Sequence, residues 1–148
     1  GGNDIHDSIG YNFKFTELQA VVGIEQMKKL SWRVERKKEI YKRYELNLEN
    51  INQINFFNHN FEYTSPWFID CKAEDRNNLQ KYLDDNGIGS RIMYPPINEQ
   101  KAYQIKGHFP VSKEIGEKGL WLPSMSQLQD SEIDYICNII SDYYKTPI

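Results

Sequence analysis

The feature that most constrains the fold is a long helical pattern across residues 16–48. Thr16 and Gln19 have the spacing of a capping box, in which a hydroxyl and an amide satisfy the free N–H groups at a helix start. Apolar residues then recur about one turn apart through the rest of the stretch. Because Ser31 can begin a new helix, the pattern predicts either one long helix or two helices with a bend at that residue.

The apolar positions of this stretch alternate with many lysines and arginines and with several glutamates. A solvated helix face with local ion pairs explains these charges, and a patch that binds an anion is the alternative. The solvated face is the favoured interpretation, because the glutamates relieve the positive charge along the helix.

Strands and helices alternate in the remainder of the chain. Residues 1–15 show no helical period, and residues 50–60 form an Asn-rich connection. The predicted strands are 63–72, 88–93 and 120–123, and the predicted helices are 75–86, 112–118 and 130–144. The pattern therefore predicts an α/β (α+β) domain, with a long helix first and then a small sheet flanked by helices.

Prolines and polar residues set several of these boundaries. Pro66 confines its strand to a sheet edge or to a strand start, because proline donates no hydrogen bond to a ladder. Gly87 supplies a left-handed stop for the helix before it, and Asp130 is expected to cap the final helix. The proline pair that ends at Pro96 must interrupt regular structure, so residues 97–109 are expected to form a loop.

Length, charge and cysteine content exclude several classes of protein. The chain has 148 residues, which favours one domain, and its formal net charge of −3 argues against a nucleic-acid binder. No apolar run approaches the ~20 residues that cross a bilayer, and the polar start has no signal-peptide core. Cys71 and Cys137 are expected to be buried thiols in a cytoplasmic protein rather than a disulfide. Because the chain does not begin with Met, we expect it to be part of a longer gene product.

Familiar catalytic and metal-binding patterns find little support in this sequence. The histidines, His6, His59 and His108, lie singly and without metal-ligand spacing to one another or to the cysteines, so no metal site is expected. The sequence also has neither a Gly-rich phosphate loop nor a Gly-x-Ser-x-Gly elbow. A hydrolase or a metalloenzyme is therefore disfavoured.

Residues 10–15 form the first of two segments that suggest ligand binding, because Asn12 and Lys14 precede a helix start there. Backbone N–H groups, the positive end of the helix dipole and a cation converge at such a place, which suits an anion. An equally good alternative is that Asn12 satisfies a turn and Lys14 is solvated.

Residues 91–103 form the second segment, a loop stiffened by two prolines. Its side chains Tyr94, Asn98, Gln100 and Tyr103 can hydrogen-bond a polyol or a phosphate, and loops on a rigid scaffold often carry binding residues. On the residues alone, the favoured alternative is a stiffened connection whose tyrosines pack in the core.

These two segments, in this order, resemble the C-terminal part of the DegT/DnrJ/StrS-type sugar-nucleotide aminotransferases. Three ordered blocks carry the resemblance, namely GYNFKFTELQAVVGIEQMKKL, GIGSRIMYPPINEQKAY and FPVSKEIGEKGLWLPS. The resemblance covers essentially the whole chain. The wording PWFIDC, YPPIN and GLWLPS looks closest to the perosamine-synthase branch, which aminates a 4-keto-6-deoxy nucleotide sugar.

The resemblance implies the fold of aspartate aminotransferase (PLP fold type I), in which a large domain holds pyridoxal 5'-phosphate and a small C-terminal domain closes over it. Residues 1–15 are then expected to be a lead-in from the large-domain boundary, and residues 16–148 to be the small domain. The resemblance also implies a homodimer with active sites at the subunit interface, glutamate as the amino donor, and a role in surface polysaccharide biosynthesis.

For single residues, the resemblance implies that Asn12 hydrogen-bonds the cofactor phosphate of the partner subunit. Lys14 stands where Arg is common in the family and is expected near the substrate's phosphates or the donor's carboxylate, although a lysine cannot grip an anion bidentately. Tyr94, Asn98 and Tyr103 are expected to face the nucleotide sugar. Many relatives have His in place of Asn98, so this position is expected to form hydrogen bonds rather than to transfer protons.

The resemblance places no catalytic residue in this chain, because the lysine that forms a Schiff base with the cofactor precedes the GYN motif in the family. The chain alone is therefore expected to be inactive and to hold no cofactor covalently. Two alternatives are an isolated, non-catalytic domain that acts by oligomerisation or binding, and a helical interaction protein that docks through residues 16–48.

Overall fold

The computed structural model describes residues 13–103 and 106–145 of the chain. The chain divides into two compact units, Gly1–Trp32 and Arg33–Ile148, and each is described by itself below. Helix α2 (Leu30–Asn47) begins in the first unit and continues through the second.

The first unit contains helix α1 (Glu17–Met27), which starts at the expected capping box. The Gln19 N–H donates to Thr16 Oγ1 over 3.3 Å, and Gln19 Oε1 accepts from the Thr16 N–H over 3.0 Å. The helix ends at Met27, and α2 begins at Leu30, so the sequence encodes two helices whose break precedes Ser31. No residue of α1, a helix that is described throughout, is buried, so its apolar side chains form no core within this unit.

The second unit is built on a four-stranded antiparallel sheet with strand order β1-β2-β4-β3. The strands are β1 (Ile54–Phe56), β2 (Ile69–Ala73), β3 (Arg91–Ile92) and β4 (Gly119–Leu122). Strand β1 lies in the stretch expected to be a connection, so that expectation is wrong. Strand β2 is an interior strand that begins at Ile69, after Pro66, rather than at residue 63. Because the proline precedes the strand, every residue of β2 keeps the N–H group that strand pairing requires.

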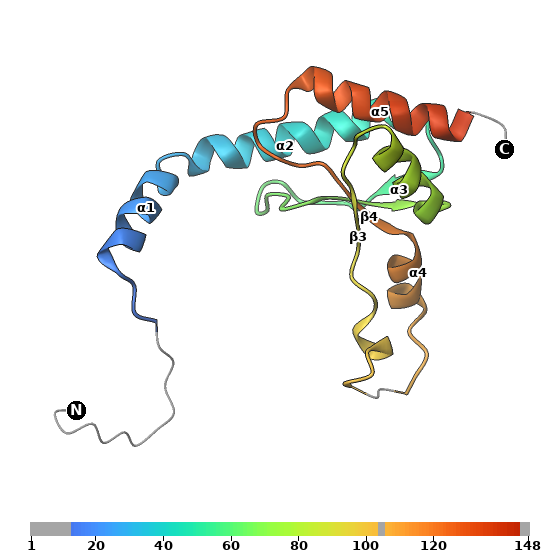
Figure 1. Cartoon of the computed structure of the whole chain (residues 1–148), viewed down its shortest axis with the longest axis horizontal. Helices are drawn as coiled ribbons and strands as arrows, with labels where there is room; N and C mark the ends of the chain where they lie inside the picture. The colour runs from blue at the N-terminus through green and yellow to red at the C-terminus, as the bar shows by residue number, and fades with distance from the viewer. Residues whose placement is uncertain (1–12, 104–105, 146–148) are drawn as a thin grey trace. The chain divides into compact units, whose positions relative to one another are not determined.

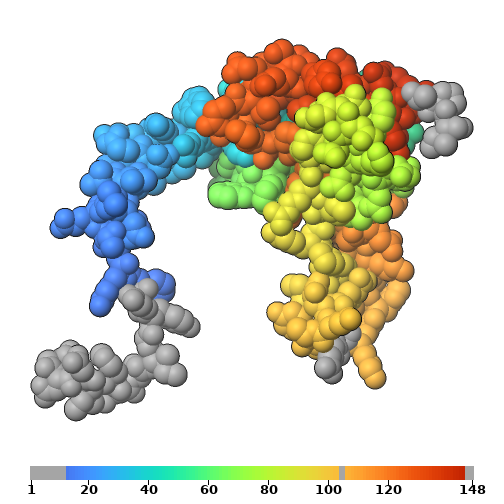
Figure 2. All heavy atoms as spheres, viewed as in Figure 1, coloured from blue at the N-terminus to red at the C-terminus, as the bar shows by residue number. Residues whose placement is uncertain are grey.

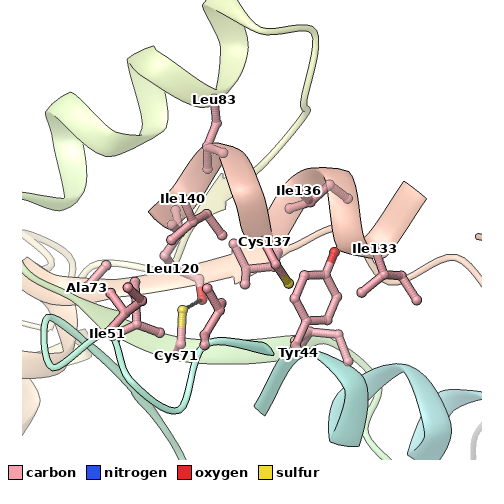
Figure 3. Packing of buried hydrophobic residues seen from close by; sticks show 14 of the residues in the cluster. Tyr44, Ile51, Cys71, Ala73, Leu83, Leu120, Ile133, Ile136, Cys137 and Ile140 are labelled. Carbon is pink, nitrogen blue, oxygen red and sulfur yellow. Dashed lines mark hydrogen bonds between the residues drawn. The ribbon is translucent and has the colours of Figure 1, made fainter. Parts of the chain in front are cut away.

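Three helices cover one face of this sheet: α2, α3 (Arg76–Asp85) and α5 (Asp130–Lys145) (Figure 1). Alternate residues of β2 are fully buried, as expected for a strand with one face in a core. Figure 3 shows the cluster that the helices and strands bury together. Its largest fully buried side chains are Tyr41, Tyr44, Ile40, Leu48, Ile69, Leu79, Leu83, Leu120, Ile133, Ile140 and Cys71.

Both cysteines are free and buried in this core, which confirms the expectation of two thiols. Cys71 donates a weak hydrogen bond to the Leu120 carbonyl over 3.6 Å (Figure 3). Burial raises the pKa of Cys71 and of Cys137 to about 12, because the core disfavours a thiolate. Neither thiol is therefore a nucleophile in the folded unit.

Charged contacts between α2 and α5 hold the helical layer together. Arg43 donates to both oxygens of Asp134, over 2.8 and 2.6 Å, and Arg36 donates to Asp130 over 2.8 Å. Asp130 is thus the first residue of α5 and an acceptor for arginine, rather than the cap that we expected. Gln129 precedes it, and its N–H donates to Glu132 over 2.7 Å.

Two ion pairs along α2 agree with the local pairing expected for its charges, whereas Arg36 and Arg43 also bind aspartates of α5. Lys38 contacts Glu35 and Arg36 contacts Glu39, each over 3.1 Å. Pairs of this kind contribute only a few tenths of a kcal/mol each on an exposed helix face, about 0.2–0.5 kcal/mol.

The remaining elements begin or end close to the predicted positions. Gly87 adopts φ +74° just after α3, which confirms the left-handed stop. Helix α4 (Pro110–Lys118) starts two residues earlier than predicted, because proline fits the first turn of a helix, where its missing N–H is not needed. Strand β3 is much shorter than residues 88–93, and residues 97–109 contain a 3-10 turn (Ile97–Glu99).

Candidate functional site

The sheet face opposite the helical core carries a row of charged and aromatic side chains. Asp70 on β2 pairs with Trp121 on β4, and Trp121 pairs in turn with Arg91 on β3. Their neighbours Cys71 and Leu120 point into the core. Because successive strand residues point to opposite faces, Asp70, Trp121 and Arg91 lie on the second face.

Aromatic rings and a guanidinium form a cluster on this face. Trp121 stacks on Phe68 with ring centroids 4.3 Å apart and meets the edge of Tyr94 at 5.1 Å. The Arg91 guanidinium carbon lies 5.1 Å from the Tyr94 ring centre and 5.7 Å from that of Trp121. These are cation–π distances, so the two rings hold the cation in place, and among the described residues it joins no ion pair.

A loop from Met93 to Tyr103 leaves β3 beside this cluster and is seated on α4 (Figure 2). The Met93 N–H donates to the Gly119 carbonyl over 3.1 Å, and Pro96 is buried. Gly116 of α4 allows Pro96 to pack against the helix, since a Cβ at Gly116 would lie 2.6 Å from Pro96 Cδ.

Helix α4 is tied to the sheet in turn by an ion pair, in which Lys72 donates to Glu114 over 3.0 Å. That hydrogen bond and the lysine charge lower the pKa of Glu114. The sheet and α4 therefore form one connected support for the loop and its side chains.

The loop presents polar side chains outward. Tyr94 and Tyr103 are 64% and 62% exposed, so the interpretation of these tyrosines as core residues is wrong. Within the described part of the chain, the side chains of Tyr94, Asn98, Gln100 and Tyr103 form no hydrogen bond. By contrast, Tyr144 donates to a backbone carbonyl over 2.6 Å. The loop groups are thus available to a ligand, and their types suit hydroxyl or phosphate oxygens.

The other residues expected at a site belong to the start of the chain. Asn12 lies outside the described residues. Lys14 is exposed and precedes the Thr16 cap of α1 by two residues, and it belongs to the first unit, whereas the loop belongs to the second. The structure therefore brings together Tyr94, Asn98 and Tyr103 on one loop.

Over residues 13–103 and 106–145, no three His, Cys, Asp or Glu side chains gather as metal ligands. His59 Nε2 lies 3.1 Å from Asp70 Oδ1, which makes a pair rather than a set of ligands. None of the helices in those same ranges is long and apolar enough to cross a membrane.

Sequence reasoning missed Arg91, Phe68 and Trp121 as members of this surface. A signal for the second face was present in residues 69–73, where buried and partly buried side chains alternate as Ile-Asp-Cys-Lys-Ala. That alternation indicates which side of β2 faces away from the core. It does not reveal the strands paired with β2, so the row across the sheet was not predictable from it.

Comparison with known proteins relates this geometry to a family. The model of the DegT/DnrJ/EryC1/StrS aminotransferase family matches residues 2–141. The chain is 29% identical to the GDP-perosamine synthase of Escherichia coli O157:H7 over 143 residues, covering 94% of this chain and 39% of that protein. It is also 29% identical to the GDP-perosamine synthase of Vibrio cholerae, covering 94% of this chain and 40% of that protein.

A solved structure gives the same result for the fold. The crystal structure of a DegT DnrJ EryC1 StrS aminotransferase from Brucella abortus matches with a TM-score of 0.84 and 26% identity, covering 99% of this chain and 41% of that chain. The chain thus spans about two fifths of the length of the curated relatives it matches.

Proposed function

This chain belongs to the DegT/DnrJ/EryC1/StrS aminotransferase family, and from that premise we propose that it is the C-terminal part of a pyridoxal-phosphate-dependent sugar-nucleotide aminotransferase. Residues 1–15 lead in from the boundary of a large domain, and residues 16–148 are the small domain. The observation that carries the proposal is the exposed loop around Tyr94 and Tyr103, whose polar side chains hydrogen-bond no other described residue. A rigidly seated loop with free hydroxyl and amide groups suits a sugar.

The reaction that we propose for the full-length protein is transfer of an amino group from glutamate to a keto sugar nucleotide. The GDP-perosamine synthases among its relatives support a 4-keto-6-deoxy sugar as the acceptor. The proposed pathway is surface polysaccharide biosynthesis, and the proposed location of the protein is the cytoplasm. The protein acts as a homodimer, in which Asn12 of one subunit binds the cofactor phosphate of the other.

Three described lysines make contacts that do not suit the covalent cofactor role, which requires a neutral amine in a pocket. Desolvation lowers the pKa of Lys37, but its amine donates to the Trp67 carbonyl over 2.9 Å. Lys72 and Lys118 are bound to glutamates over 3.0 and 2.6 Å. The family resemblance implies that the Schiff-base lysine precedes the GYN motif, and we propose that it lies upstream of this chain. The contribution of this chain is to bind and orient the sugar nucleotide, through Tyr94, Asn98 and Tyr103, with Lys14 near a substrate anion.

The test is a transamination screen of the full-length protein. Purified enzyme is incubated with glutamate and with a panel of 4-keto and 3-keto nucleotide sugars, and amino-sugar products are identified by mass. Amination of at least one 4-keto-6-deoxy substrate is expected, with one 2-oxoglutarate formed for each amino sugar. If no member of the panel is aminated while the protein is folded and holds its cofactor, the proposed reaction is wrong.

A second candidate is an oligomerisation or binding module, and one observation favours it. Leu18, Val21, Val22 and Ile24 of α1 are each more than half exposed, which is unusual for apolar side chains on one helix. This candidate predicts self-association, measured by sedimentation, that is lost in Val22→Asp and retained when Lys14 is changed. Association that depends on Lys14, or no association, would rule it out.

A further inference from the structure

Arg91 differs from other arginines of the second unit in how its charge is satisfied. Arg36 and Arg43 donate to aspartates, and Arg76 donates to the Gly116 carbonyl over 2.8 Å. Within the described ranges, the side chain of Arg91 donates no hydrogen bond and joins no ion pair, although it is exposed on the sheet. Its guanidinium is therefore held but not neutralised.

The rings that hold Arg91 fix its position and leave its donors free. The guanidinium lies over Tyr94 and Trp121 at 5.1 and 5.7 Å, and Trp121 is itself fixed by strand pairing and by its stack on Phe68. A cation–π contact uses up no N–H donor, so the five N–H donors of the guanidinium remain available for hydrogen bonds. A planar, pre-positioned fork of donors matches an oxyanion such as a phosphate or a carboxylate.

The carboxylate that shares this row of the sheet does not occupy that fork. Asp70 pairs with Trp121 in the strand register, but its Oδ1 lies 3.1 Å from His59 Nε2. No other acidic side chain in the described part of the chain contacts Arg91. The cluster therefore presents one uncompensated positive charge beside the polar loop.

We propose that Arg91 binds a phosphate group of the nucleotide-sugar substrate, with Trp121 and Tyr94 as the residues that position it. This inference rests on the proposed function and extends it to a second part of the substrate. Tyr94 links the aromatic cluster to the loop, since it contacts Arg91 and also belongs to the loop that carries Asn98 and Tyr103. A ligand with a phosphate beside a sugar fits that order, whereas the carboxylate of the amino donor, which is also an oxyanion, has no sugar to contact the loop.

The test measures nucleotide binding by the full-length protein with isothermal titration calorimetry. The probes are GDP, UDP and dTDP, and the one that the wild type binds most tightly is then used for the variants. Loss of a charge-assisted bidentate contact in Arg91→Gln is expected to weaken its binding about ten- to hundredfold. Arg91→Lys keeps the charge without the planar set of donors, so its nucleotide affinity should lie between those of the wild type and Arg91→Gln. Trp121→Leu removes one supporting ring and should also weaken binding.

Lys42→Gln is the matched control, because it removes one exposed positive charge from α2, the helix that packs on the other face of the sheet. Its affinity should stay within about twofold of the wild type, since exposed charges beyond a Debye length of about 10 Å are largely screened. Circular dichroism of each variant confirms that any loss of binding does not come from unfolding.

Steady-state kinetics separate the two possible sources of the oxyanion. Arg91→Gln should raise the KM for the keto sugar nucleotide at least tenfold and leave the KM for glutamate unchanged. Unchanged nucleotide affinity, a rise confined to the glutamate KM, or a wild type that binds none of the nucleotides would overturn the proposal. If the wild type aminates no sugar yet binds a nucleotide through Arg91, the proposed reaction fails and the assignment of Arg91 stands.

Discussion

Gly119 is the residue whose replacement should most directly test how the site is built. It ends α4 and begins β4, and its N–H donates to the Ile115 carbonyl at the end of the helix. Its own carbonyl accepts from the Met93 N–H over 3.1 Å and from Arg76 over 3.3 Å. Helix, strand and substrate loop therefore meet at one backbone unit.

The expected cost of Gly119→Ala follows from the space around this residue. A Cβ there would lie 2.5 Å from the Ile115 carbonyl oxygen and 2.5 Å from Met93 Sδ. The methionine side chain can rotate away, but the carbonyl can move only if the last hydrogen bond of α4 weakens. Overpacking of this kind costs about 1–3 kcal/mol, and a weakened hydrogen bond adds about 1 kcal/mol. We therefore expect Gly119→Ala to lower the free energy of unfolding by about 2–4 kcal/mol.

Urea denaturation followed by circular dichroism measures this loss, with Gly89→Ala as the matched control. A Cβ at Gly89 meets no atom within 4 Å, and both variants change the unfolded chain in the same way. With a urea slope of about 2 kcal/mol per molar, the Gly119→Ala midpoint should fall by about 1–2 M relative to the control. Equal midpoints for the two variants would refute the argument that backbone contact at Gly119 holds the loop in place.

Four further predictions concern the site and the core. Tyr103→Phe should raise the KM for the sugar nucleotide more than that for glutamate, and equal effects would remove this hydroxyl from the sugar site. Asn12→Ala should weaken cofactor retention, measured by dialysis and absorbance, without lowering the thermal midpoint, because the change removes an amide proposed to bind the cofactor phosphate and no apolar side chain. Hydrogen bonds from Arg43 lower the pKa of Asp134, so that pair stabilises the fold above the unfolded-state pKa of about 3.9 and ceases to do so as the pH falls through the lower folded-state pKa. Arg43→Gln should accordingly destabilise the protein at pH 7, and its difference from the wild type in urea midpoint should shrink below about pH 4. Both thiols, whose pKa burial raises to about 12, should resist iodoacetamide at pH 8 and react only in urea, as intact mass would show.

The elements that local patterns encode were predictable from the sequence, and the short strands were not. Thr16 with Gln19 carries a complete capping signal within four residues, and Gly87 has one conformational role at the end of α3. Strand β1 has only three residues, too few to show alternation, and it exists because Ile54 and Phe56 pair with residues of β2. Such a strand is defined by its partner, which local sequence does not name.

The same distinction applies to the site. The polar residues of the loop were identified from their types and from the two prolines, while the surface that faces them was missed. Arg91, Trp121 and Asp70 are far apart in sequence and meet only through strand register. Register depends on the whole pattern of buried residues and turns, so a row across three strands cannot be derived from any one of them.

The contacts that hold the loop in place imply that the residues in and around it fall into two groups with different responses to substitution. Pro96 is buried against Gly116, so both determine where the loop lies rather than what it binds. Tyr103 and Arg91 are exposed, and their side chains form no hydrogen bond with other described residues. We therefore expect these side chains to affect ligand binding rather than the fold. Variants of the first group should therefore change substrate KM and the urea midpoint together, whereas variants of the second group should change KM alone. A substitution at Tyr103 that lowered the urea midpoint as much as it raised KM would show that the loop is held by its ligand-facing residues, and the division argued from Pro96 and Gly116 would not hold.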